Sequence, residues 1–101
     1  MQRIDWSKRG DYVRSRHGVE TAWANEAVHD AHAVWLMPDP ASQSGHAVRV
    51  IGYSAMARAV LTVILVDASA DPAEQPDGEW WGSNAWIANQ RDQNFYEEAQ
   101  P

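Results

Sequence analysis

Residues 47–66, AVRVIGYSAMARAVLTVILV, restrict the fold of this chain more than any other segment. Two apolar runs rich in β-branched residues flank a short break, a pattern that predicts an antiparallel hairpin. Its only charged residues are Arg49 and Arg58. If residues 54–57 form the turn, Tyr53 pairs with Arg58, and Arg49 pairs with a threonine of the second strand. Because side chains alternate along a strand, Arg49, Tyr53 and Arg58 would share one face of the sheet, with the two arginines about 13 Å apart.

The segments on either side of this hairpin carry helical and extended patterns. The predicted elements are helices at residues 8–16, 20–30 and 90–99 and strands at residues 34–37 and 80–87. Ser7 is placed to cap the first helix, and the Asn89–Asp92 spacing resembles a capping box for the last one. The fold class is therefore α+β, with two N-terminal helices, an antiparallel sheet of about three to five strands and a C-terminal helix.

The size and composition of the chain narrow its class. A length of 101 residues predicts one domain, residues 1–101. No apolar run approaches the roughly 18–20 residues that span a bilayer, and the first residues lack the apolar core of a signal peptide. The chain has no cysteine, which excludes disulfides and thiolate chemistry. We therefore expect a cytoplasmic protein that does not bind membranes.

Charge is distributed unevenly along the chain. The net charge is −6, with a balance of +1 over residues 1–66 and −7 over residues 67–101. Because an acidic protein repels phosphate overall, an RNA site would have to be local and would lie in the first two thirds of the chain. Residues 67–79, DASADPAEQPDGE, are predicted to form an acidic, flexible loop within the sheet.

Several short motifs follow one another along nearly the whole chain. They are IDW (residues 4–6), RHGV (16–19), PDP (38–40), RVIGYS (49–54), RAVLTV (58–63) and YEE (96–98). In this order and spacing they resemble the BrnT family, the toxins of type II toxin–antitoxin pairs in bacteria, which is related to the RelE-like endoribonucleases. The chain would be a divergent member of that family.

The resemblance implies an α+β toxin that cleaves RNA without a metal or cofactor and so arrests growth. It also implies a DNA-binding antitoxin as partner, with a hetero-oligomer of the two as the neutralised form. Arg49 and Arg58 match the hairpin arginines of the family and would hold the phosphate. The chain departs from the family at His46, where an acidic residue is usual, and at Trp86, where a basic residue is usual. These departures keep open an alternative, a non-catalytic interaction module of the same fold.

RNA cleavage without a metal needs cations on the phosphate, a base for the 2′-hydroxyl and an acid for the leaving oxygen. The planar, permanently charged guanidinium groups of Arg49 and Arg58 suit the first role, and His46 suits proton transfer near neutral pH. Further substrate-binding candidates are Arg16, Tyr53, Arg91 and Tyr96. Each candidate also has a structural interpretation: solvated charges at helix faces and strand ends, a turn histidine, and core tyrosines.

Six tryptophans are a high number for 101 residues. Trp6, Trp23 and Trp35 lie at expected core positions. Three more, Trp80, Trp81 and Trp86, lie in the last predicted strand, where neighbouring side chains point to opposite faces and cannot all enter one core. We therefore expect this group to contact a protein partner, because aromatic side chains are common at the centres of interfaces.

The four histidines give no clear metal signal. His29 and His32 have the spacing of a ligand pair on a helix, but no third ligand lies at a recognisable spacing. The sequence therefore predicts neither a metal site nor a cofactor.

Overall fold

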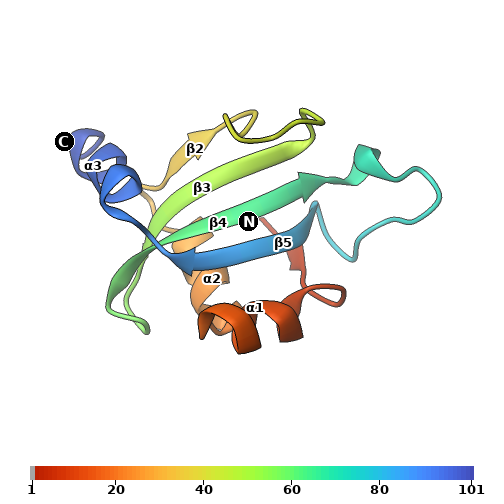
Figure 1. The fold of residues 1–101 in the computed structure, drawn as a ribbon, viewed down its shortest axis with the longest axis horizontal. Coiled ribbons are helices and arrows are strands. Elements are labelled where there is room, and N and C mark those ends of the chain that lie inside the picture. The colour runs from red at the N-terminus through yellow and green to blue at the C-terminus, as the bar shows by residue number, and fades with distance from the viewer. Residues whose placement is uncertain (1) are drawn as a thin grey trace.

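A five-stranded sheet forms the centre of the molecule in the computed structural model, which describes residues 2–101 (Figure 1). Its strands are β1 (Ile4–Asp5), β2 (Val34–Leu36), β3 (Ala47–Ser54), β4 (Ala59–Asp67) and β5 (Trp80–Ile87). They lie in the order β1-β5-β4-β3-β2. All neighbours are antiparallel except β1, which runs parallel to β5. The predicted α+β class is confirmed, and the parallel β1 is the one departure from an antiparallel sheet.

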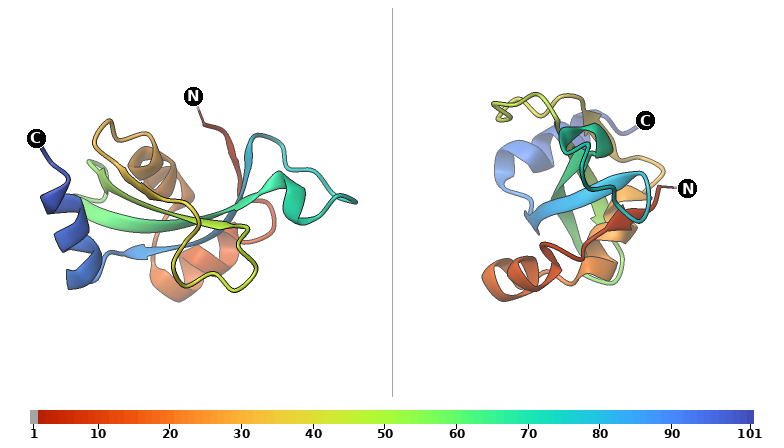
Figure 2. Two further views of the ribbon diagram at one scale, coloured as in Figure 1. Left: turned by 90° about the horizontal axis from the view of Figure 1, so that it is seen from above. Right: turned by 90° about the vertical axis from the view of Figure 1, so that its right-hand side faces the viewer.

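Helices cover both faces of this sheet. The helices α1 (Gly10–His17) and α2 (Thr21–Val28) pack on one face, and α3 (Gln90–Glu98) lies across one end of the other face, as the two views of Figure 2 show. A single turn of 3-10 helix, η1 (Ala68–Ala70), follows β4. Two helices before the hairpin and one after it confirm the predicted order of elements.

The helix ends are explained by local chemistry. Gly18 ends α1 in the left-handed conformation, with a φ of 66°, which glycine adopts without steric strain. The side chain of Asn89 accepts a hydrogen bond from the Asp92 amide and caps α3, as predicted. The prediction that Ser7 caps α1 is wrong, because the helix begins at Gly10 after Arg9 without a side-chain cap.

The hydrophobic core lies between the sheet and the first two helices. Its fully buried members are Val13, Val19, Ala24, Ala27, Val50, Leu61, Val63, Leu65 and Ala85. Helix α2 crosses β3 so closely that a Cβ atom on Gly52 would collide with the backbone carbonyl of Ala27. Trp6 is buried in this core, and Trp23 and Trp35 pack against it half-buried, which agrees with their predicted core positions.

The predicted register of the hairpin is wrong by two residues. Tyr53 lies opposite Val60. Arg49 lies opposite Ile64. A shift of two keeps every strand side chain on its predicted face, because the side-chain period of a strand is two. It moves Arg58 out of the strand, however, into a turn where its φ is +54°.

The turn forms one residue later than predicted because helix α2 holds it there. The carboxylate of Glu26 accepts hydrogen bonds from the Ser54 hydroxyl (2.8 Å) and from the Met56 amide (2.9 Å). The same hydroxyl oxygen accepts a hydrogen bond from the Ala57 amide. These bonds, led by the one from Met56, lower the pKa of Glu26 and keep the carboxylate charged. A helix far away in the sequence therefore fixes the end of the hairpin.

The acidic loop, residues 67–79, lies against the first residues of the chain. Glu74 pairs with Lys8 at 2.7 Å, and Asp77 pairs with Arg3 at 3.1 Å. The Asp77 amide also donates to the Asp5 carboxylate, which lowers the pKa of Asp5. The loop that the sequence predicts to be flexible thus makes several polar contacts, and they lie at the end of the molecule away from α3 (Figure 1).

The described helices are short. The longest, α3, has nine residues, and within residues 2–101 no helix is long and apolar enough to cross a bilayer.

Candidate functional site

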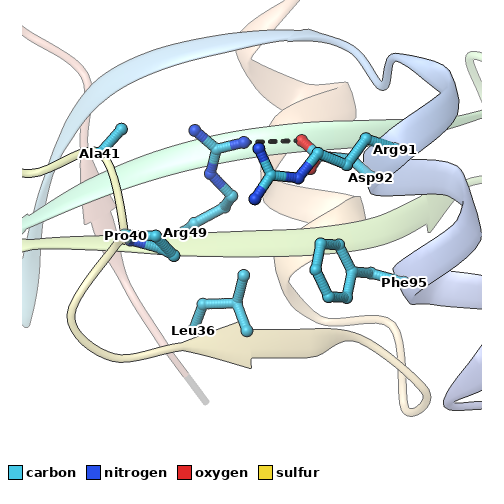
Figure 3. A pocket seen from close by; sticks show the side chains of 7 residues that line it. All are labelled: Leu36, Pro40, Ala41, Arg49, Arg91, Asp92 and Phe95. Carbon is cyan, nitrogen blue, oxygen red and sulfur yellow. Dashed lines mark hydrogen bonds and ion pairs between the residues drawn. The ribbon is translucent and has the colours of Figure 1, made fainter.

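A pocket of about 270 Å³ opens between the sheet and helix α3 (Figure 3). Its floor is the Arg49 side chain of β3, and its sides are the start of α3, the end of β2 and the turn that follows β2. The lining residues are Leu36, Pro40, Ala41, Arg49, Arg91, Asp92 and Phe95. Two of them, Arg49 and Arg91, are among the predicted site residues.

Arg49 is held between two buried carboxylates. Its Nε donates to Asp39 Oδ1 at 3.0 Å, and its Nη1 donates to Asp92 Oδ2 at 2.9 Å. The Thr62 hydroxyl donates to the same Asp92 oxygen at 2.7 Å. The exposed fraction of the Arg49 side chain is 17%, against 7% for Asp39 and 2% for Asp92. This buried ionic cluster, Asp39–Arg49–Asp92, fastens a strand, a turn and a helix together.

The local sequence explains how both carboxylates reach Arg49. Asp39 belongs to the PDP turn, where its amide donates to the Ala47 carbonyl and its carboxylate also accepts from the Ala41 amide. Asp92 lies in the first turn of α3, whose start is fixed by the Asn89 cap. The spacing predicted a reciprocal capping box, but the Asp92 carboxylate turns to the sheet instead and receives its hydrogen bonds from Arg49 and Thr62.

The Arg49 guanidinium keeps donors for a ligand. It carries five N–H bonds, and the ionic cluster uses two of them. Its Cζ atom also lies 5.7 Å from the centre of the Trp86 ring, within cation–π distance. The guanidinium is therefore fixed in orientation by three neighbours and still partly open to the pocket.

Arg91 brings a second cation to the same pocket. Among residues 2–101 it has no ion-pair partner, and its Cζ atom lies 5.9 Å from the centre of the Phe95 ring. In Figure 3 the guanidinium groups of Arg91 and Arg49 both point into the pocket. The two arginines come from β3 and α3, so only the folded chain brings them together.

This arrangement suits the binding of an anion. The formal charges of the two arginines and the two carboxylates cancel, but both carboxylates are almost fully buried, whereas Arg91 is exposed. A phosphate at the pocket mouth would therefore meet guanidinium donors first. No histidine or tyrosine is among the residues that line the pocket, so a group for proton transfer near neutral pH is not part of its described lining.

The other predicted catalytic residues, and the substrate-binding candidate Arg16, lie elsewhere. Arg58 is in the exposed β3–β4 turn, six residues from the partner of Arg49, which corresponds to about 20 Å along the strand. The predicted separation of about 13 Å between Arg49 and Arg58 is therefore too short. His46 is an exposed residue just before β3, and its backbone carbonyl accepts from the Asp67 amide. Arg16 is exposed in the last turn of α1.

The two tyrosines are near α3 but outside the pocket lining. The Tyr96 hydroxyl donates to the Asp30 carboxylate at 2.6 Å, and burial together with this bond raises the pKa of Tyr96 to about 12. Burial disfavours the charge on Asp30, but hydrogen bonds from Tyr96 and from the His32 and Tyr53 amides outweigh it and lower the Asp30 pKa. Tyr96 is therefore a structural donor, while the Tyr53 ring is exposed at the end of β3.

The tryptophans of β5 are covered more than the sequence predicts. Trp80 packs with Trp35 at a ring distance of 6.0 Å. Trp81 is buried, with the Lys8 ammonium 4.3 Å from its ring centre. Trp86 is half-buried, with the Arg49 Cζ atom 5.7 Å and the His17 ring 6.0 Å from its ring centre. Trp80 and Trp81 of the predicted partner surface therefore pack within the fold.

Sequence reasoning missed the acidic residues that complete the site, Asp39 and Asp92, and the aromatic side chain at its mouth, Phe95. Asp39 was visible only as part of the PDP motif, and Asp92 only as a helix-capping residue. Within residues 2–101 no group of three His, Asp or Glu side chains is placed to hold a metal ion.

Comparisons with known proteins add no relative to this description. No family model matches the chain, and no curated protein matches it. The structure defines a small α+β protein with a mixed five-stranded sheet, in which two helices follow β1 and precede the other four strands and one helix follows the last strand. Its distinguishing feature is the pocket in which Arg49 and Arg91 meet.

Proposed function

We propose that the chain is a BrnT-like toxin domain that acts on RNA and is neutralised by a DNA-binding antitoxin. The RNA phosphate binds in the pocket between β3 and α3, on the donors of Arg49 and Arg91. The observation that carries this proposal is the meeting of two arginines, far apart in the sequence, in one concave site. Planar guanidinium groups hold two phosphate oxygens at once and stay charged at every physiological pH.

The overall charge of the chain fits a short-range site. A net charge of −6 repels RNA at a distance, so binding depends on direct contacts and not on electrostatic attraction over the whole surface. The acidic loop does not cover the pocket, because its ion pairs are with Lys8 and Arg3. The pocket is therefore open to a phosphate in the free protein.

RNA cleavage, the activity that the resemblance implies, would take place at this phosphate. The 2′-hydroxyl would give its proton to water and its oxygen would attack the phosphorus, while the bond to the 5′-oxygen breaks and that oxygen takes a proton from water. Arg49 and Arg91 would stabilise the negative charge that grows on the phosphate during this step. Arg49 is already oriented by Asp39 and Asp92, which is the preorganisation that such stabilisation requires. The proposal assigns no base, since His46 and the tyrosines lie outside the pocket lining.

A second function, a non-catalytic interaction module, is favoured by the charge of the buried ionic cluster. The two carboxylates outnumber the one cation of Arg49, and no histidine is among the residues that line the pocket. Such a module would dock a partner through the end of β5, where Ile87 is exposed beside the half-buried Trp86. Trp80 and Trp81 would contribute less, because they pack within the fold.

The test compares growth on induced expression of the chain alone and together with its neighbouring gene. Arg91→Gln removes the exposed cation of the pocket, and Arg16→Gln is the matched control, an exposed helix arginine outside it. Growth arrest that is relieved by the neighbour and lost in Arg91→Gln, but kept in Arg16→Gln, supports the toxin function. If the folded wild-type chain neither arrests growth nor binds RNA, the proposal fails and the interaction module takes its place.

A further inference from the structure

We infer that the pocket binds one unpaired nucleotide of RNA, with its base stacked on Phe95 and its phosphate on Arg91 and Arg49. This inference rests on the proposed function, since it takes RNA as the ligand and specifies which form of RNA the site accepts. It assigns a role to Phe95, an aromatic residue that neither the sequence motifs nor the fold requires at this position.

The position of Phe95 on α3 is the first observation that supports a base-stacking site. Phe95 follows Arg91 by four residues, so both side chains lie on one face of α3. Its exposed fraction is 38%, its ring centre lies 5.9 Å from the Arg91 Cζ atom, and Figure 3 shows the ring among the side chains that line the pocket. An exposed ring next to two guanidinium groups is the combination with which proteins hold a base and its phosphate.

The size and the walls of the pocket are the second observation, and they support one nucleotide of any base. A volume of about 270 Å³ is close to the lower limit of roughly 300 Å³ for small-ligand sites, which is room for one nucleotide. The wall opposite Phe95 is formed by Leu36, Pro40 and Ala41, which present no charged or hydroxyl group to a base edge. Stacking without edge recognition tolerates every base, so the site selects a free base and not a particular sequence.

Base pairing determines whether the pocket can bind single-stranded RNA or duplex RNA. In a duplex each base is stacked between its neighbours, and an aromatic side chain cannot reach its face. A single strand offers unstacked bases that a surface ring can cover. The site should therefore bind single-stranded RNA and reject a duplex of the same sequence.

The experiment measures the affinity of a fluorescently labelled single-stranded RNA, and of its duplex, by fluorescence anisotropy. Phe95→Leu is the test variant. Tyr12→Leu is the matched control, because Tyr12 is 40% exposed and lies under a guanidinium, that of Arg9 at 4.0 Å, but outside the pocket. We expect Phe95→Leu to weaken single-strand binding about 5- to 150-fold, which corresponds to the loss of one base stack. Tyr12→Leu should leave the affinity unchanged, and the duplex should bind more weakly than the single strand.

Further variants separate the possible failures. Phe95→Trp keeps a stacking surface and should retain binding, which distinguishes stacking from a packing effect of Phe95. If Arg91→Gln weakens RNA binding but Phe95→Leu does not, the nucleotide site is refuted while the proposed function stands. If wild-type protein binds no RNA at low salt, the proposed function fails. If Phe95→Leu instead releases a co-expressed antitoxin without affecting RNA, the pocket is a protein interface and the inference is wrong.

Discussion

Replacing Arg49 with alanine is expected to destabilise the fold before it changes any chemistry. The substitution leaves Asp39 and Asp92 buried without their cation, and the Asp92 carboxylate then keeps only the hydrogen bond from Thr62. Removing one partner of a buried ion pair costs about 3–5 kcal/mol. A domain of this size has a free energy of unfolding of roughly 5–15 kcal/mol, so Arg49→Ala would lose a large part of its stability.

Urea denaturation followed by tryptophan fluorescence measures this loss directly. Arg58→Ala is the control, because Arg58 is exposed in a turn and its removal should change the free energy of unfolding by less than about 0.5 kcal/mol. The double variant Arg49→Ala/Asp92→Asn removes one of the two stranded charges, that of Asp92, together with its cation. It should therefore be less destabilised than the sum of the two single variants, with a coupling of about 1–3 kcal/mol.

The reasoning is refuted if the free energy of unfolding of Arg49→Ala lies within about 1 kcal/mol of the wild-type value, with an unchanged m-value. A buried, unpaired carboxylate should destabilise the protein by more than that. The outcome also decides how growth assays are interpreted. A loss of toxicity in a half-unfolded Arg49→Ala protein would not locate the phosphate site. Arg91→Gln, which touches no ion pair among residues 2–101, is the cleaner test.

Three further predictions concern the elements around the site. Tyr96→Phe removes the hydrogen bond to Asp30 and should lower the free energy of unfolding by about 1.5–3 kcal/mol near neutral pH. Because folding raises the pKa of Tyr96 from 10.0 to about 12, the wild type should lose this contribution as pH rises between these values, and urea titrations of the variant should not show this loss. Arg58→Gly relieves the left-handed backbone at φ +54° and should leave thermal stability unchanged or raise it by up to about 1 kcal/mol, with no effect on RNA binding. Gly52→Ala forces a Cβ atom against the Ala27 carbonyl and should destabilise the chain by about 3 kcal/mol in the same urea assay.

Most of the fold could be predicted from the sequence because local signals agreed with one another. The β-branched runs around residues 47–66 specified the hairpin, and the side-chain period of two kept Arg49 and Tyr53 on the correct face even though the turn was misplaced. Asn89 marked a helix start that the structure confirms. The turn was misplaced because the deciding contact comes from Glu26, a residue on another helix.

The candidate site could be predicted only in part. Arg49 and Arg91 were each recognised as cations, but their meeting depends on how α3 crosses the sheet, which no spacing in the sequence encodes. The carboxylates of Asp39 and Asp92 are 10 and 43 residues from Arg49 in the sequence. Each also has a sufficient local explanation, a turn for Asp39 and a helix cap for Asp92, and this local explanation concealed the tertiary role.

Arg49 therefore has two uses that depend on each other. The carboxylates that neutralise its charge also fix its orientation, so the conformational entropy of this side chain is lost on folding and not on binding. A phosphate that docks on the remaining donors then meets a guanidinium that does not have to reorganise, which is the condition under which a positioned charge stabilises a reacting phosphate best. The charge of Arg49 is balanced by the carboxylates of Asp39 and Asp92. Arg91 is exposed and forms no ion pair among residues 2–101, so its charge is available to a phosphate in the pocket. The proposed RNA site therefore requires no basic surface on this acidic chain.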